Sequence, residues 1–249
     1  MTQAKKIDDL EPAAALPPLS DIIFQALATR QAGFSQTAGK ARRFLPEIGP
    51  LAGFSEPADP DFDALAQLAW RGPVVIFLDA PFDPRAGWKA VDSAPLVLMV
   101  WHGSGLPEED SCASILKLSV EDSADMLELT AMTKPGPFGP RTHELGSFFG
   151  IRIGNRLAAM AGERLKVAGY TEVSAVCTRP DHLGKGYAAA LMRTVMRGIL
   201  ERGETPFLHS RADNLRAIAL YERLGFRHRE AGHFVVLERE MKDAGAHRT

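Results

Sequence analysis

One stretch of this chain of 249 residues, positions 171–225, constrains the fold more than any other. Residues 171–178 form a short, mostly apolar run rich in β-branched side chains, which predicts a buried strand. Pro180 has no backbone N–H, so the strand should end before it. Apolar side chains then recur at helical spacing up to about Arg202, which predicts a helix with one face against a sheet. This order of strand, turn and helix predicts an α/β protein.

Two glycines, Gly184 and Gly186, lie where that helix begins. Glycines let a backbone approach a ligand closely, and the first N–H groups of a helix favour a phosphate. Lys185 adds a positive charge. Three interpretations compete here: an ordinary strand-to-helix turn, a dinucleotide-binding turn of the G-x-G-x-x-A type, and a site for the pyrophosphate of coenzyme A. The dinucleotide site is disfavoured because five residues separate Thr178 from Gly184.

The second half of the stretch separates these interpretations. Residues 206–210 predict another strand, and Arg211–Phe226 contains a helix with one apolar side, which Gly225 ends. This segment and the loop Leu183–Ala188 resemble the closing helix and the pyrophosphate loop of the GNAT acetyltransferases, in the version called FR47-like. The loop pattern of that family is R/Q-x-x-G-x-G/A, and Leu183 replaces its Arg or Gln. The resemblance covers roughly residues 112–240.

The resemblance implies an acyl-CoA N-acyltransferase fold, in which helices flank a mixed, mostly antiparallel central sheet. It also implies an enzyme that transfers an acetyl group from acetyl-CoA to a primary amine by direct attack, without a metal ion. Two alternatives stay open: an acyltransferase for another acyl group, and a non-catalytic module that binds acyl-CoA. The acceptor would be a small-molecule or peptide amine, and the sequence does not indicate which.

Tyr221 and Glu172 are the catalytic residues that the resemblance implies. Tyr221 would donate a proton to the leaving thiolate, and Glu172, at the start of the strand that reaches the thioester, would act as the base. The simpler alternatives are a half-buried helix tyrosine and a solvated glutamate at a strand edge. No His or Asp is spaced to activate Cys177, so an inert thiol is expected there.

The resemblance also assigns a cofactor site. The backbone at the end of the first strand would pair with the pantetheine arm like an added strand, and the glycine loop would hold the pyrophosphate. Asn214 would hydrogen-bond the cofactor, or is an ordinary residue of the first helical turn. The cofactor-binding residues implied are Val176, Cys177, Thr178, Leu183, Gly184, Lys185, Gly186, Tyr187, Ala188, Asn214 and Ala217.

A rigid loop precedes this region. Residues 133–140 contain three prolines and two glycines, and in the GNAT layout they fall between the first two strands, where acceptors are held. Phe138, Arg141 and Glu144 are therefore candidate substrate-binding residues, with an exposed helix start as the alternative for the residues after the loop. Further on, residues 148–166 predict a hairpin that turns at Gly-Asn.

The N-terminal half shows no catalytic constellation. Helices are expected near 20–31 and 61–70, and buried strands at 73–78 and 96–101, whereas residues 42–54 look extended and turn-rich. The resemblance and the length suggest an α/β accessory half, which is interpreted as a degenerate GNAT-like unit. The predicted organisation is a flexible tail at 1–18, an accessory domain at 19–110, a catalytic domain at 111–241 and a tail at 242–249.

The net charge of −2 is unevenly placed. Residues 1–140 carry 11 Lys and Arg against 19 Asp and Glu, or −8, whereas residues 141–240 carry 16 against 11, or +5. A basic half suits an anionic ligand such as coenzyme A, and its scattered charges argue against nucleic acid. No apolar run has the length of a membrane span, and Cys112 and Cys177 give neither a disulfide framework nor a zinc spacing. A cytoplasmic monomer or homodimer is expected.

Overall fold

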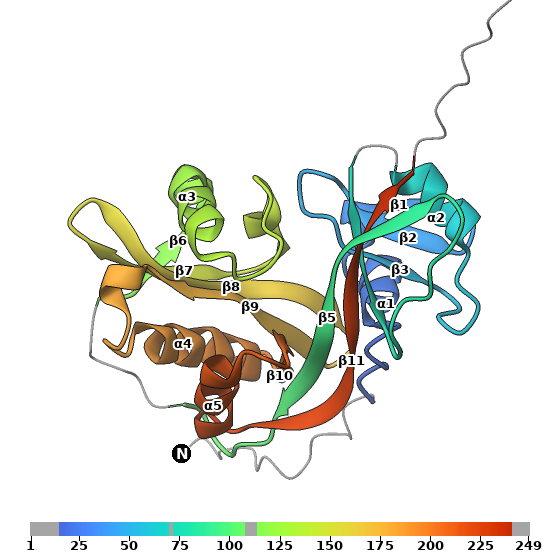
Figure 1. The fold of residues 1–249 in the computed structure, drawn as a ribbon. Coiled ribbons are helices and arrows are strands. Elements are labelled where there is room, and N and C mark those ends of the chain that lie inside the picture. The colour runs from blue at the N-terminus through green and yellow to red at the C-terminus, as the bar shows by residue number, and fades with distance from the viewer. Residues whose placement is uncertain (1–14, 70–71, 108–113, 241–249) are drawn as a thin grey trace, which may run out of the picture.

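An eight-stranded sheet forms the centre of the computed structural model, which describes residues 15–69, 72–107 and 114–240 (Figure 1). Neighbouring strands pair antiparallel except β9 and β10, which are parallel. This mixed, mostly antiparallel sheet confirms the predicted fold class. In spatial order the strands are β4 (Val74–Leu78), β11 (Phe226–Arg239), β5 (Trp88–Trp101), β10 (Thr205–Arg211), β9 (Tyr170–Thr178), β8 (Arg156–Val167), β7 (Phe148–Ile153) and β6 (Leu116–Leu118).

Helices cover both faces of this sheet. The helices α4 (Tyr187–Glu201) and α5 (Leu215–Arg223) bury their apolar sides against one face. The helices α1 (Ile22–Ala28) and α3 (Ser123–Thr133) pack on the other face. The alternation of side chains along the strands decides which cluster each residue joins. In β10, for example, Phe207 packs with α1 whereas Leu208 packs with α4.

A smaller three-stranded sheet lies at one end of the molecule (Figure 1). It consists of β1 (Ser35–Ala38), β2 (Ala41–Phe44) and β3 (Ala52–Phe54), and α2 (Phe62–Leu68) packs beside it. Asp61 caps α2 by accepting a hydrogen bond from the Ala64 N–H at 2.8 Å. The short 3₁₀ helices are η2 (Ala32–Phe34), η4 (Val120–Asp122), η5 (Thr142–Leu145) and η6 (Pro180–His182).

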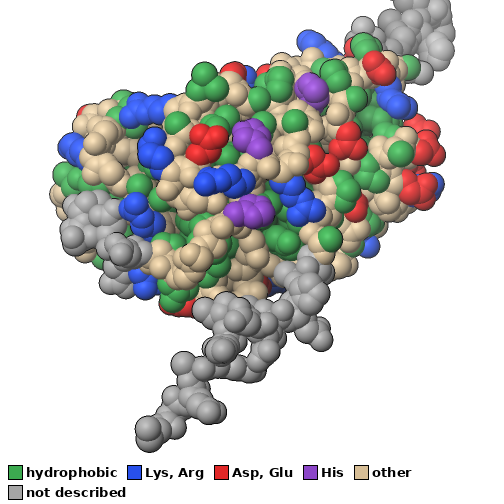
Figure 2. Space-filling view, turned by 90° about the horizontal axis from the view of Figure 1, so that it is seen from below, with side chains coloured by type: hydrophobic (Ala, Val, Ile, Leu, Met, Phe, Trp, Pro, Cys, Tyr) green, Lys and Arg blue, Asp and Glu red, His purple; other side chains and the backbone are tan. Residues whose placement is uncertain are grey.

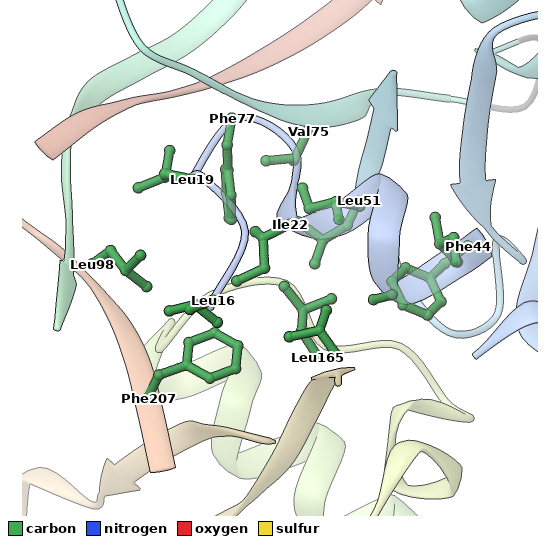
Figure 3. Packing of buried hydrophobic residues seen from close by; sticks show 14 of the residues in the cluster. Leu16, Leu19, Ile22, Phe44, Leu51, Val75, Phe77, Leu98, Leu165 and Phe207 are labelled. Carbon is green, nitrogen blue, oxygen red and sulfur yellow. The ribbon is translucent and has the colours of Figure 1, made fainter. Parts of the chain in front are cut away.

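Residues 42–54, expected to be extended and turn-rich, contain most of β2 and all of β3. The predicted tail at 1–18 also needs correction in its described part. Leu16 is 2% exposed and packs beside Phe207 and Leu98 (Figure 3). The side chain of Arg229 donates a hydrogen bond to the Leu16 carbonyl at 2.9 Å. Residues 1–14 and the predicted tail at 242–249 lie outside the described residues.

The main sheet crosses the predicted boundary between residues 110 and 111. The strand β5 lies between β10 and β11 and pairs with both, and β4 pairs with the far edge of β11. The strand β5 is also longer than predicted, because its exposed segment 89–93 pairs with β11. The region predicted as an accessory domain therefore supplies two strands of the central sheet. The two-domain division, as a statement about units that fold separately, stays a prediction.

A truncated chain tests that division. A fragment of residues 111–249 lacks β5, so β10 and β11 lose their common partner, and the buried cluster on the α1 side of the sheet loses 14 of its 18 residues. We expect this fragment to be unfolded, because unpaired buried backbone groups and lost core contacts exceed the usual net stability of a domain. Far-UV circular dichroism and NMR amide dispersion, with the full chain as control, measure this. A cooperatively unfolding fragment would support separate domains.

Candidate active site

The strands β9 and β10 diverge in the middle of the sheet. They pair over three residues, with Thr205–Phe207 opposite Tyr170–Glu172. Beyond Glu172, β9 keeps β8 on one side, but no strand of the described residues pairs with its other side. An unpaired strand edge presents N–H and C=O groups to which an extended ligand can bind. This edge includes the backbone of Val176, Cys177 and Thr178, to which the family resemblance assigned the pantetheine arm, and that contact stays a prediction.

A bulge at Ala175 shapes this free edge. Ala175 has a φ of +52°, and the register between β8 and β9 shifts there. After the bulge, Val176 packs toward α4 whereas Cys177 packs toward α3. Burial raises the pKa of the Cys177 thiol to about 11, which fits the expected inert thiol.

The glycine loop lies at the start of α4. Gly184 and Gly186 have φ values of +81° and +82°, a region that side chains other than glycine rarely adopt. A Cβ added at either glycine would meet no atom within 4 Å, so the loop faces open space. Gly186 is the N-cap of α4 and supplies no side-chain acceptor for the first N–H groups. Those groups are free to hydrogen-bond an anion.

Two side chains of this loop differ in their contacts. The ammonium of Lys185 lies 2.8 Å from Nδ1 of His182, on the surface beside the helix start. Leu183, which replaces the polar residue of the family pattern, is 49% exposed. Figure 2 shows Lys, Arg and His side chains across the middle of one face and acidic side chains gathered at one end of it. This distribution agrees with the charge asymmetry of the sequence.

Tyr221 lies on α5 and faces the cluster that packs α4 and α5 on the sheet. Its ring lies 6.3 Å from that of Phe226, and its residue is 9% exposed. Burial raises the pKa of the Tyr221 phenol to about 12, so it keeps its proton at neutral pH. Three predicted cofactor-binding residues pack against the same cluster: Val176, Tyr187 and Ala217. Residues from β9, α4 and α5 thus join the cluster that contains this tyrosine.

Asn214 caps α5. Its side-chain oxygen accepts a hydrogen bond from the Ala217 N–H at 3.3 Å, and the residue is exposed. This geometry matches the simpler alternative, a residue of the first helical turn, and its contact with the cofactor stays a prediction.

Glu172 lies in an environment that does not suit the predicted base. Its two oxygens accept four hydrogen bonds, which are all that a carboxylate holds comfortably. Oε2 accepts from Arg164 Nε at 2.8 Å and from the Leu165 N–H at 3.1 Å. Oε1 accepts from Arg164 Nη2 and from His209 Nδ1, each at 2.6 Å. No lone pair remains for a substrate proton.

The low pKa of Glu172 also argues against its predicted role as the base. Glu172 is 1% exposed, and burial alone raises its pKa, but Arg164 and His209 outweigh burial and hold the pKa at about 2. A carboxylate that is this acidic is a poor proton acceptor near neutral pH. Neither the role of Glu172 as the base nor the alternative of a solvated strand-edge residue is borne out. The side chain lies inside the protein and connects β9 to β8 and β10.

We call the place where β9 and β10 diverge, just beyond Glu172, the fork. A small pocket lies beside it, on the face of the sheet that α3 covers. Its walls include Pro135 and Phe138 from the rigid loop, Arg164 from β8, and Ser174 and Ala175 from β9. The Phe138 ring packs edge-on against Phe148 at 5.7 Å. Of the three predicted substrate-binding residues, Phe138 therefore borders this pocket.

The other two predicted substrate-binding residues lie outside the pocket. Arg141 and Glu144 pair with each other on the surface, through contacts of 2.7 and 2.8 Å. The loop itself is anchored through Thr142, whose hydroxyl accepts from the Gly139 N–H at 2.7 Å and donates to the Ile48 carbonyl. The N-terminal part of the chain thus holds the wall of the pocket.

Sequence reasoning missed Arg164 and His209. Both contact Glu172, but they lie on different strands, eight and 37 residues away in the chain. A single sequence holds no periodic signal that links them. A charged residue within a run of apolar strand residues was the one available hint at Glu172 and at Arg164.

In the part of the chain that the structure describes, no group of three or more His, Cys, Asp or Glu side chains is placed to hold a metal ion. No helix among the described residues is both long and apolar enough to cross a membrane.

Replacing Glu172 by Gln tests the buried ion pair. The pKa is depressed from 4.5, so the ionised group stabilises the fold above pH 4.5, and this contribution fades as the pH falls toward 2. We expect Glu172→Gln to cost about 3–5 kcal/mol of unfolding free energy at pH 7 and clearly less at pH 3. Urea unfolding at both pH values measures the difference.

Glu56→Gln is the control for that substitution, because Glu56 pairs with Lys40 on the surface at 2.8 Å. It should change the unfolding free energy little at either pH. A loss for Glu172→Gln that is small, or the same at both pH values, contradicts the ion pair described.

Comparison with known proteins identifies relatives of this chain. The family model of FR47-like proteins matches residues 148–235. A crystal structure of a proposed GNAT-family acetyltransferase from Novosphingobium aromaticivorans is 37% identical, with a TM-score of 0.83, and the match covers 90% of this chain and 100% of that one. No curated protein sequence matches.

More distant structures share the fold. A GCN5-related N-acetyltransferase from Kribbella flavida is 20% identical with a TM-score of 0.57, over 90% of this chain and 98% of that one. A GCN5-related N-acetyltransferase-like protein from Streptococcus suis is 14% identical with a TM-score of 0.53, over 87% and 93%. The extent of the 37% identical match decides the assignment. This chain belongs to the GNAT family of acetyltransferases.

Proposed function

We propose that this protein transfers an acetyl group from acetyl-CoA to a primary amine of an acceptor, by direct attack and without a metal ion. The observation that carries the proposal is the free edge of β9 beyond Glu172, which leads toward the glycine loop at the start of α4. An extended thioester arm and a pyrophosphate need these two features in this order. The 37% identical relative is described as a proposed acetyltransferase, which agrees with this assignment.

Each part of the cofactor has a matching feature in the proposal. The pantetheine amides would hydrogen-bond the backbone of Val176–Thr178 as an added strand. The pyrophosphate would accept from N–H groups at Gly184–Ala188, helped by the dipole of α4 and by Lys185. Leu183, Tyr187, Asn214 and Ala217 complete the proposed contacts with coenzyme A.

The transfer itself needs two proton movements. The unprotonated amine attacks the thioester carbon and a C–N bond forms, the nitrogen releases one proton to water, the C–S bond breaks, and the thiolate of coenzyme A leaves. Tyr221 is the proposed donor of the proton to that thiolate, since its raised pKa keeps it protonated at neutral pH. We do not propose Glu172 as the base, because its oxygens already accept four hydrogen bonds.

Removing the Tyr221 hydroxyl tests the proposed acid. Tyr221→Phe keeps the ring that packs against Phe226, so the fold and the binding of acetyl-CoA should survive. We expect kcat to fall by roughly 100-fold or more, as for the loss of a positioned acid. Release of the coenzyme A thiol, measured with an amine panel, gives the rate, and calorimetry gives the affinity. An unchanged kcat would remove Tyr221 from the mechanism.

A carboxylate in the glycine loop tests the anion site. Gly186→Glu puts a negative charge beside the N–H groups of α4 and a side chain at a φ of +82°. Binding of acetyl-CoA should fall below detection in calorimetry. Gly203→Glu is the control, since Gly203 has a φ of +74°, follows the other end of α4 and likewise faces open space. Equal binding by both variants would place the cofactor elsewhere.

A further inference from the structure

We propose that Arg164 binds a carboxylate of the acceptor, so that the acceptor is an amine with a carboxylate only a few bonds away. This inference rests on the proposed acetyl transfer and specifies its substrate class. It starts from the pocket on the α3 side of the fork, where Arg164 is the one charged residue of the lining among the described residues. Its side chain is 11% exposed.

The pocket lies beside the proposed position of the thioester. Ser174 and Ala175, at the bulge of β9, form its wall on the sheet side. The backbone of Val176–Thr178, which follows directly, is the proposed partner of the pantetheine arm. An acceptor amine that attacks the thioester from the α3 side therefore has its other substituents in this pocket.

The guanidinium of Arg164 has hydrogen-bonding capacity left. An arginine side chain carries five N–H donors, and Glu172 takes one on Nε and one on Nη2. Three N–H groups remain, one on Nη2 and two on Nη1. Nη1 lies 4.0 Å from the position that a Cβ of Gly136 would take, so it faces the rigid loop across the pocket. The Nη1–Nη2 edge of the guanidinium can therefore bind a second carboxylate in bidentate geometry.

The free edge of the guanidinium favours an anion. Glu172 balances the formal charge of Arg164 but contacts its Nε–Nη2 edge, so the Nη1–Nη2 edge presents donors and no acceptor. Because the side chain of Arg164 is mostly removed from water, a negative charge at the remaining edge is attracted more strongly than it would be in water. The other lining residues named above are apolar or neutral, so nothing else there competes for the anion.

The surrounding structure fixes the backbone of Arg164, and Glu172 holds its guanidinium. Arg164 lies in a bulge of β8, where the register with β9 shifts between Glu163 and Lys166. The buried amide of Gln31 bridges this bulge, donating to the Arg164 carbonyl at 2.7 Å and accepting from the Lys166 N–H at 3.1 Å. A preorganised arginine loses little freedom when it binds a carboxylate.

The test compares amines that differ in the carboxylate alone. Alanine, β-alanine and γ-aminobutyrate are each paired with the corresponding amide, and release of the coenzyme A thiol is followed. We expect kcat/KM for at least one acid to exceed that of its amide, and Arg164→Lys to lower this acid-to-amide ratio roughly 10- to 100-fold. The different basicities of the paired amines cancel, since the ratio is compared between proteins.

Arg156→Lys is the matched control. Arg156 is an exposed arginine of the same strand, about 26 Å from Arg164 along β8, and its replacement should leave the ratio unchanged. The Km for acetyl-CoA should stay the same in both variants. If Arg164→Lys does not fold, the double variant Arg164→Gln with Glu172→Gln removes both charges together and should show the same loss.

The outcomes separate this inference from the proposed function. Acetylation of amides as well as acids, with a ratio that Arg164→Lys does not change, overturns the carboxylate site and leaves acetyl transfer intact. If no amine is acetylated, the N-acetyl product of each pair is titrated into the protein with coenzyme A present. Weak or equal binding of acid and amide products overturns the inference, and a preference for acids that Arg164→Lys removes supports it. Failure to bind acetyl-CoA sinks the proposed function itself.

Discussion

The buried carboxylate of Glu172 joins three strands at the residue where two of them diverge. It binds Arg164 and the Leu165 N–H on β8 and His209 on β10, and it is the last residue of β9 with a partner on β10. A fully buried carboxylate is stable in a protein only when its charge and lone pairs are matched. The two strands therefore diverge at a fixed place, and the free edge of β9, the bulge at Ala175 and the pocket beside Arg164 lie next to it.

The N-terminal region completes this arrangement from outside the FR47-like segment. Its strand β5 separates β10 from β11, Gln31 bridges the bulge that holds Arg164, and the Ile48 carbonyl anchors the loop that walls the pocket. These contacts connect a region without recognisable chemistry to the site. They explain physically why one sheet can need a chain nearly three times as long as the segment that the FR47-like family model matches.

Elements that depend on neighbouring residues could be predicted from local sequence patterns. The strand, glycine loop and helix at 171–202 follow from β-branched residues, Pro180 and apolar spacing, and the structure has β9, η6 and α4 there. Contacts between residues far apart in the chain leave no such pattern in the sequence. The exposed segment 89–93 is part of a strand because β11 pairs with it. Glu172 looked solvated because its partners Arg164 and His209 come from other strands. The base was therefore assigned to a residue whose lone pairs are already filled.

The central claim is that acetyl-CoA lies along the free edge of β9 and ends at the glycine loop. Amide hydrogen exchange with and without acetyl-CoA tests it most directly, because it reports which backbone N–H groups gain a hydrogen-bond partner. We expect slower exchange at residues 174–178 and 184–188 when acetyl-CoA is bound. Protection confined to other segments, or none at saturating acetyl-CoA, would contradict the claim.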